Sequence, residues 1–222
     1  SKTVVTKYKG SGLLYDTERL DNFLYEVFAA GVMDVSIKTR IGRDSSAEFE
    51  DIIDIYKKYP VSELIIHPRV QTDFYKNTPN MEVFAEGVAA YGRTDTVCYN
   101  GDINSVADYE RFIGNYPDIM KVMIGRGMIA DPCLAERIKS TATGRAYDWN
   151  RFFTFHDELY NNYCESDVGR GNTMFKMKEL WAYWSRLFVD MEGAERALKK
   201  IRKTRDNGEY EAAVRVLAAL CR

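Results

Sequence analysis

The stretch KVMIGRGMIADP, residues 121–132, joins a short apolar run to a Gly-Arg-Gly turn and then to the start of a helix. Lys121 to Gly125 has the length and composition of a buried strand, and Asp131 and Pro132 suit an N-cap followed by the first helical position. A strand that ends in glycine and arginine suits either a tight turn or a phosphate, because loop N–H groups and a guanidinium both bind anions.

The same alternation of strand and helix occurs three times before this stretch. Strands are expected at 34–38, 63–67 and 96–100, and helices at 45–59, 81–91 and 105–116, after a first amphipathic helix at about 17–30. Ser45 and Glu48 have the spacing of a capping box. The strand ends recur every 25 to 33 residues, close to the roughly 30 residues per unit of a (β/α)8 barrel. The four units therefore predict half of a TIM barrel over residues 1–144.

From about residue 148 onward the sequence shows only helical patterns, which predict a separate all-α domain over residues 145–222. Four helices are expected there, at 149–164, 173–190, 194–208 and 209–221. The aromatic residues Trp181, Tyr183 and Trp184 are expected in its core. The role of the basic run 196–205 stays open, since its cations suit either contact with RNA or a solvated helix face.

Composition narrows the possible classes of protein. The 222 residues carry 31 Lys and Arg against 33 Asp and Glu, a net charge of −2 that points neither to a strong polyanion binder nor to an acidic tail. No run approaches the roughly 20 apolar residues of a membrane helix, so no membrane association is expected. Four dispersed cysteines predict reduced thiols and a cytoplasmic location, and two histidines argue against a metal site.

Polar residues follow each of the four expected strands. They are Lys38 and Arg40, His67 and Arg69, Asn100, Gly101 and Asp102, and Gly125 and Arg126. The ends of parallel strands meet at one edge of a sheet, where α/β proteins place their sites. Taken singly, these residues suit solvated strand ends, a core histidine or turns. Together they suit an anionic, heteroaromatic ligand such as a flavin nucleotide, with glycine and arginine at its phosphate.

Four motifs together resemble the tRNA-dihydrouridine synthase family: VSIKTRIG (35–42), LIIHPRV (64–70), CYNGDINS (98–105) and VMIGRGMIADP (122–132). The stretch FKMKELWAYWSRLF (175–188) is similar to the helical tRNA-binding domain of that family. The resemblance implies the C-terminal half of an FMN-binding TIM barrel followed by that domain. It also implies an oxidoreductase that reduces the C5–C6 bond of uridine in tRNA, with NADPH reducing the flavin.

The resemblance also implies roles for individual residues. Lys38 and His67 would contact the flavin ring, Asn100, Gly101 and Asp102 the ribityl–phosphate region, and Gly125 and Arg126 the phosphate. Arg40 and Arg69 would line the uridine pocket, and Lys176 and Lys178 would face tRNA. The family usually has glycine where Pro68 stands, which puts the backbone freedom of that turn in question.

One element of the family pattern is missing. The family's general acid is a cysteine in an N-x-x-C-P loop after the fourth barrel strand, and this loop is expected upstream of Ser1, so no catalytic residue is assigned in this chain. The chain then reads as a fragment that is inactive alone and that self-associates through its open sheet edges. The alternatives are another FMN- or phosphate-binding TIM-barrel oxidoreductase and a non-catalytic tRNA-binding module.

Overall fold

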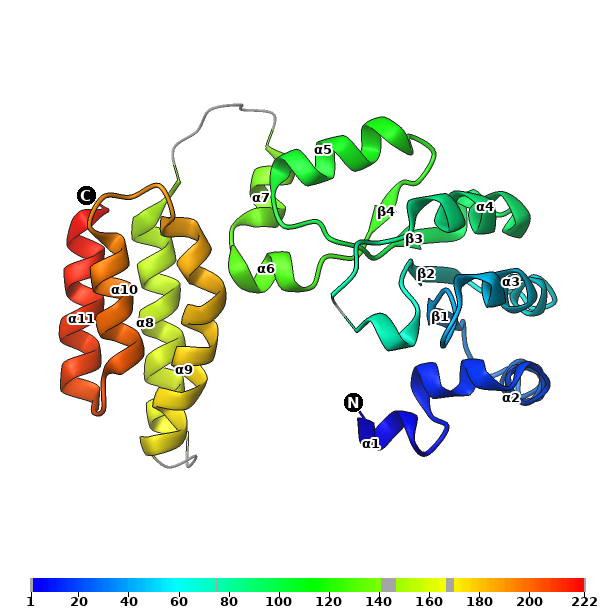
Figure 1. Cartoon of the computed structure of the whole chain (residues 1–222), viewed down its shortest axis with the longest axis horizontal. Helices are drawn as coiled ribbons and strands as arrows, with labels where there is room; N and C mark the ends of the chain where they lie inside the picture. Colours follow the sequence, from blue (N-terminus) through cyan, green and yellow to red (C-terminus); the bar gives the residue numbers. More distant parts are fainter. Residues whose placement is uncertain (1, 75, 141–146, 167–169, 222) are drawn as a thin grey trace. The chain divides into compact units, whose positions relative to one another are not determined.

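The structure is a computed structural model that describes residues 2–74, 76–140, 147–166 and 170–221 (Figure 1). The chain divides into two compact units. The first comprises Ser1–Ile103 with Ala107–Ile124, and the second comprises Asn104–Val106 with Gly125–Arg222. The domain boundary expected after residue 144 lies outside the described residues, and it stays a prediction.

The first unit is built on a four-stranded parallel sheet with the strand order β1-β2-β3-β4. Its strands are β1 (Ser36–Arg40), β2 (Glu63–His67), β3 (Val97–Tyr99) and β4 (Lys121–Val122). Its main helices are α2 (Thr17–Ala29), α3 (Phe49–Lys57), α4 (Met81–Tyr91) and α5 (Val106–Asn115), with the short helices α1 (Lys2–Val5), η1 (Gly10–Tyr15), η2 (Ser46–Glu48), η3 (Gln71–Asp73) and η4 (Thr94–Thr96). Parallel strands in sequential order, each followed by a helix, are the arrangement of a partial TIM barrel. This confirms the expected fold class.

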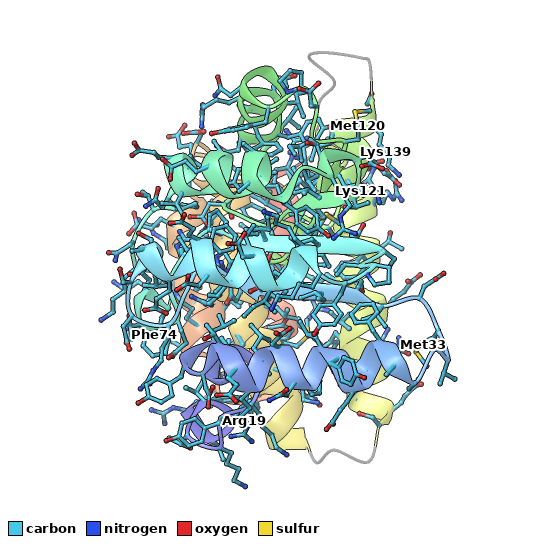
Figure 2. All side chains as sticks on the ribbon, turned by 90° about the vertical axis from the view of Figure 1, so that its right-hand side faces the viewer. Arg19, Met33, Phe74, Met120, Lys121 and Lys139 are labelled. Atoms are coloured by element: carbon cyan, nitrogen blue, oxygen red, sulfur yellow. The ribbon has the colours of Figure 1, made fainter. Side chains whose placement is uncertain are left out.

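All neighbouring strands of the sheet pair in parallel. Residues that precede strands and residues that follow them therefore lie at opposite ends of the sheet. Met33 and Met120, which precede β1 and β4, lie on one side in Figure 2, and Phe74, which follows β2, lies on the other. The expected first strand was placed two residues too early, so Lys38 lies inside β1 and not at its end. The apolar residues Val35 and Ile37 suggested the earlier position, but pairing with β2 continues to Arg40.

The two faces of the sheet differ in chemistry. Alternate residues face the helices: the Tyr56 hydroxyl of α3 donates to Thr39 Oγ1 at 2.9 Å, and the Tyr99 ring stacks on Phe112 of α5 at 4.1 Å. The opposite face carries charged and polar side chains, and we call it the polar face. Its polar members are Ser36, Lys38, Arg40, Glu63, His67, Cys98, Asn100 and Lys121, and the apolar Ile65 lies on the same face. Because most parallel strands are apolar on both sides, this alternation marks the polar face as the place for a site.

Local signals explain several helix boundaries. The capping box is confirmed: Ser45 Oγ accepts from the N–H of Ala47 at 3.2 Å, and Glu48 Oε1 accepts from the N–H of Ser45 at 2.8 Å. Asn80 caps α4 through the N–H of Val83. These interactions satisfy N–H groups that helix starts leave unpaired.

The N-terminal segment lies beside β1, the first edge of the sheet. A cavity of about 910 Å³ is lined by η1, α2 and β1 together. Within α2, Leu20 and Leu24 are buried as the expected apolar stripe requires, whereas Phe23 is half exposed and lines this cavity. Self-association through the sheet edges stays a prediction.

The second unit is helical. It contains α6 (Arg126–Ala130), α7 (Leu134–Lys139), α8 (Trp149–Glu165), α9 (Arg170–Trp184), η5 (Ser185–Phe188), α10 (Ala194–Lys203) and α11 (Asn207–Leu220). Trp181 and Trp184 are each 1% exposed in its aromatic core, which confirms their expected position, and Tyr183 is half buried. The helix expected at Asp131 begins at Leu134, after Asp131 Oδ1 accepts from the N–H of Cys133 at 2.9 Å. Among the described residues, no helix is both long enough and apolar enough to cross a membrane.

Two helical glycines of the first unit test how tightly its helices pack. A Cβ on Gly87 of α4 would lie 2.2 Å from Cε1 of Phe49, whereas a Cβ on Gly114 of α5 would meet no atom within 4 Å. We expect Gly87→Ala to lower the free energy of unfolding by about 1–3 kcal/mol through overpacking, and Gly114→Ala to raise it by about 0.5–1 kcal/mol. Urea denaturation of both variants checks this pair, and equal effects would contradict the described packing of α3 on α4.

Candidate active site at the carboxyl ends of the strands

Lys38 and Asn100 meet on the polar face. Lys38 Nζ donates to Asn100 Oδ1, and Asn100 Nδ2 donates to the carbonyl of Met123 at 2.7 Å. The backbone carbonyl engages the amide nitrogen, so the amide oxygen of Asn100 turns toward the lysine. Burial, followed by the charge of Arg40, lowers the pKa of Lys38.

Arg69 is the most buried cation of the site, with a side chain that is 1% exposed. Its Nη1 lies 3.1 Å from Asp102 Oδ1, its Nη2 donates to Asp102 Oδ2, and its Nε donates to the carbonyl of Asn77 at 2.5 Å. The same Nη1 lies 3.1 Å from Nε2 of His67. This bidentate contact with a carboxylate supplies the countercharge that a buried guanidinium needs.

His67 ends β2 and is 7% exposed. Burial is the first cause that lowers its pKa to about 3, and the charges of Arg40, Lys38 and Arg69 act in the same direction. The imidazole is therefore neutral near pH 7. It is a buried histidine that contacts Arg69, and its role in a ligand site stays a prediction.

Pro68 fits the turn between His67 and Arg69. The N–H of Arg69 donates to the carbonyl of His67 at 2.7 Å, which closes a three-residue turn around Pro68. The fixed φ of proline is close to that of the common three-residue turn. The carbonyl of Pro68 accepts from the N–H of Asn80 at 2.7 Å, so this turn also leads into α4.

Arg40 holds the loop that follows β2. Its Nη1 donates to the carbonyl of Val70 at 2.6 Å, and its Nη2 donates to the carbonyl of Phe74 at 3.2 Å. Both predicted uridine-pocket arginines, Arg40 and Arg69, thus use N–H groups on backbone carbonyls of one loop. Their contact with uridine stays a prediction.

The glycines of the expected site differ in what surrounds them. A Cβ on Gly101 would lie 1.8 Å from the hydroxyl of Tyr99, so packing within the chain already requires a glycine there. A Cβ on Gly125 would meet nothing within 4 Å, and its φ of −103° is open to other residues. The backbone of Gly125, with φ −103° and ψ −89°, lies outside the helical and extended regions, and its contact with a phosphate stays a prediction. Gly125 and Arg126 belong to the second unit, where they begin α6.

The two lysines expected to face tRNA have partners within the second unit. Lys178 Nζ donates to the carbonyl of Thr204, which ends α10. Lys176 lies over the ring of Tyr163, 4.7 Å from its centroid. A lysine at the C-terminus of a helix satisfies an unpaired carbonyl and stabilises the helix dipole, so Lys178 has a structural role whether or not it contacts RNA.

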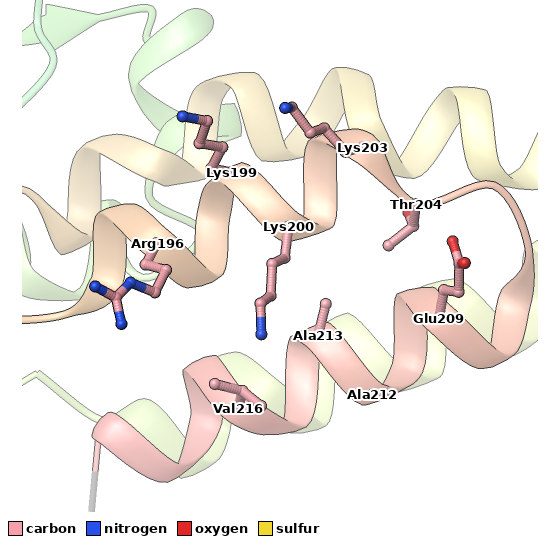
Figure 3. Close-up of a pocket in the computed structure, with 9 residues that line it drawn as sticks. All are labelled: Arg196, Lys199, Lys200, Lys203, Thr204, Glu209, Ala212, Ala213 and Val216. Atoms are coloured by element: carbon pink, nitrogen blue, oxygen red, sulfur yellow. The ribbon is translucent and has the colours of Figure 1, made fainter.

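Another set of cations lines a groove between α10 and α11 (Figure 3). We call it the basic groove, and its cations are Arg196, Lys199, Lys200 and Lys203. Ala212, Ala213 and Val216 of α11 form its apolar wall, and its volume is about 510 Å³. In Figure 3, Lys200 points toward α11, whereas Lys199 and Lys203 point away from it.

A profile of the family described as Dihydrouridine synthase (Dus) matches residues 1–217 of the chain. The chain belongs to the dihydrouridine synthase family. It is 29% identical over 150 residues to the tRNA-dihydrouridine(16) synthase of Cupriavidus necator, a match that covers 65% of this chain and 45% of that protein. It is 29% identical over 187 residues to the tRNA-dihydrouridine(16) synthase of Shewanella oneidensis, covering 82% and 54%. The chain spans about half the length of these relatives.

Within this dihydrouridine synthase chain, the structure brings together four predicted site residues, Lys38, His67, Asn100 and Asp102, with Arg40 and Arg69 beside them. Sequence reasoning missed the carbonyls of Asn77 and Met123, which orient Arg69 and Asn100. Backbone acceptors carry no signature of residue type, so no sequence signal could have indicated them.

Two cysteines of this family member lie in or next to regular elements. Cys98 is buried in β3 on the polar face, and burial raises the pKa of its thiol to about 11. Cys133 precedes α7, and burial likewise raises its pKa. Both thiols are therefore protonated near pH 7.

The neutral state of His67 predicts a pH dependence of stability. Its pKa is about 3 in the folded protein, against an ordinary value of 6.5 for histidine, so between these values the unfolded chain binds the proton and stability falls as the pH falls. We expect His67→Gln to reduce this loss by up to about 1.4 kcal/mol per pH unit below pH 6.5. Urea denaturation of both proteins from pH 4.5 to 8 measures the difference. The two profiles should run parallel above pH 7, and equal slopes below pH 6 would contradict a neutral His67.

Proposed function

We propose that the protein containing this chain is an FMN-dependent tRNA-dihydrouridine synthase that uses NADPH to reduce the C5–C6 bond of a uridine in tRNA. The observation that carries the proposal is the Lys38–Asn100 pair beside a neutral His67, on the polar face of three adjacent strands. The names of both relatives support uridine 16 as the target.

The residues present fit FMN. Lys38 offers a cation for the electron-rich edge of a reduced flavin, and Asn100 fixes its position. The role of Gly125 and Arg126 at a phosphate rests on the resemblance alone. When bound, FMN supplies the hydride that uridine reduction requires. Lys38 and His67 would hold the ring system.

The protonation states support this division of roles. His67 is neutral and so adds no charge beside Lys38 and Arg40. Two cations next to a neutral donor or acceptor suit an anionic ring better than three cations would, because mutual repulsion of the side chains is smaller.

The Lys38–Asn100 pair can be tested in the whole protein. We expect Lys38→Met and Asn100→Ala to lower dihydrouridine formation about 100-fold or more, as the loss of one fixed donor does in other sites. Mass spectrometry of an unmodified tRNA transcript after incubation with NADPH measures the product and its position. Lys121→Met is the matched control, since Lys121 also lies on the polar face but pairs with Glu63 at 3.3 Å. Full activity of Lys38→Met would contradict the proposal.

A non-catalytic tRNA-binding module is the second candidate, and the basic groove favours RNA binding in either case. The four cations are spaced i, i+3, i+4 and i+7 on α10 and are exposed. In the described part of the chain, none of their side chains has an ion pair or hydrogen bond. Other cations of the unit form ion pairs: Arg137 pairs with Asp131 at 2.7 Å, and Arg151 pairs with Glu136.

The charge of the groove is not explained by helix stability alone. Lys200 and Lys203 lie in the last turn of α10, where cations favour the helix dipole, but Arg196 and Lys199 lie before it. Like charges at these spacings repel each other. Glu209, the acid of the groove, accepts from the N–H of Arg205 at 2.9 Å. The groove extends into a second hollow that also includes Arg196, Lys200 and Val216. The four cations of the basic groove extend over about 10 Å along α10. This length suits contact with neighbouring phosphates of one RNA strand.

Replacing three groove cations tests this assignment. We expect Arg196→Gln/Lys200→Gln/Lys203→Gln to weaken tRNA binding at least about tenfold near 0.1 M salt. The slope of log affinity against log salt should become flatter by about 2 to 3, because fewer counterions are released. Fluorescence anisotropy with a labelled tRNA transcript measures both quantities.

The matched control removes the same charge elsewhere in the second unit. Arg186→Gln/Arg202→Gln/Arg215→Gln changes three exposed cations that do not line the basic groove. We expect it to keep most of the affinity. Equal losses in the two triple variants would show that only net charge matters and would remove the groove from the proposal.

A further inference from the structure

The motif Asn100-Gly101-Asp102 places Asp102 next to Arg69, whereas its Asn100 contacts Lys38. Both carboxylate oxygens of Asp102 accept from the Arg69 guanidinium. We propose that Asp102 is a positioning residue that, through Arg69, fixes the imidazole of His67 in the tautomer with its proton on Nδ1. The inference concerns side chains of this chain alone and holds whatever ligand the site takes.

The tautomer follows from the chemistry of the contact between Arg69 and His67. A guanidinium has only N–H donors and stays charged. Since Nη1 of Arg69 lies 3.1 Å from Nε2 of His67, Nε2 must be the acceptor and cannot carry a proton. A neutral imidazole has one N–H, so the proton is on Nδ1. The low pKa of His67 agrees with a cation facing Nε2.

The orientation of the guanidinium depends on Asp102. Arg69 is held from two directions, by the carbonyl of Asn77 at Nε and by Asp102 at both terminal nitrogens. The Asn77 carbonyl engages Nε alone, so the terminal nitrogens depend on Asp102 and His67 for acceptors. The Arg69 side chain is 1% exposed, so water cannot replace the carboxylate freely. Among the described residues, Asp102 is the carboxylate that pairs with Arg69.

This role is additional to the one that the resemblance implies for Asp102, a contact with the ribityl–phosphate region of FMN, which stays a prediction. In the structure the carboxylate faces a buried cation. A carboxylate also repels a phosphate, so pairing with Arg69 removes an unfavourable charge from the site. The consequence for His67 is that Nδ1 is a donor, and any group that meets Nδ1 must accept.

The sequence allows a direct test, because His67 and His156 are the two histidines of the chain. His156 is an internal reference in the second unit. Trp181 Nε1 donates to the Tyr210 hydroxyl oxygen at 2.8 Å, so the hydroxyl donates to His156 Nε2 at 2.6 Å. His156 Nδ1 lies 2.8 Å from the Asp157 carboxylate and must donate to it. Both imidazoles are therefore expected as Nδ1–H tautomers.

Long-range proton–nitrogen NMR of this chain labelled with ¹⁵N-histidine at pH 7 reports the protonation of each ring nitrogen. We expect two rings, each with a protonated Nδ1 and an unprotonated Nε2. In Asp102→Asn, the two nitrogen shifts of His67 should move toward each other as the tautomers mix, and those of His156 should stay unchanged. Asp102→Glu, which keeps the carboxylate, should restore the unmixed pattern at least in part.

Asp108→Asn is the matched control. Asp108 also pairs with an arginine, Arg111, at 3.1 Å, and its side chain is 26% exposed against 34% for Asp102. We expect no shift of the His67 nitrogens in this variant. A protonated Nε2 on His67 in the unmodified chain would overturn the inference even if Asp102→Asn does not fold. Unchanged His67 shifts in folded Asp102→Asn, or equal shifts in Asp108→Asn, would also overturn it.

Discussion

The parallel register of β1, β2 and β3 is the constraint on which the first unit depends. Arg40 pairs with His67, and Ile66 pairs with Tyr99. Because side chains alternate along a strand, this register puts Lys38, His67 and Asn100 on one face. A slip of one residue in β2 would turn His67 toward the helices and bring Ile66 onto the polar face. The apolar residues that pack on α3, α4 and α5 therefore also hold the polar residues in place.

The electrostatics of the site follow from that arrangement. Lys38, Arg40 and Arg69 bring three cations to the ends of adjacent strands, yet each has acceptors within the unit. Backbone carbonyls take much of this role, which leaves Asp102 as the anion that compensates the most buried cation. With His67 neutral, the site keeps a moderate positive character that suits an anionic cofactor without excessive repulsion among its own side chains.

The second unit combines a packed core with an exposed charged groove. Its stability comes from an aromatic core that includes Phe152, Trp181, Trp184 and Phe188. The Trp181–Tyr210–His156 chain satisfies the polar atoms inside this core. Because other helices supply most of this core, α10 buries only Ala194, Ala197, Leu198 and Ile201. The remaining faces of α10 can therefore carry cations. This is the physical basis for a charged groove on a short helix.

The order of the elements and the identity of the family could both be read from the residues alone. Apolar runs found β2 at its observed bounds and β1 within two residues, and periodicity found α4 at its observed bounds, because alternation and helical spacing are local properties. Motif spacing indicated Lys38, His67, Asn100 and Asp102, which lie close together in the first unit, and their roles stay predictions. Helical periodicity did not indicate α6, since its five residues are too few to show a period. The task of each polar side chain, in contrast, became clear only in three dimensions. Lys178 and Arg40 both read as ligand-binding cations in the sequence, but their acceptors are carbonyls 26 and 30 positions away. The physical reason is that hydrogen bonds depend on distances between segments remote in the chain, and backbone carbonyls are present at every position alike.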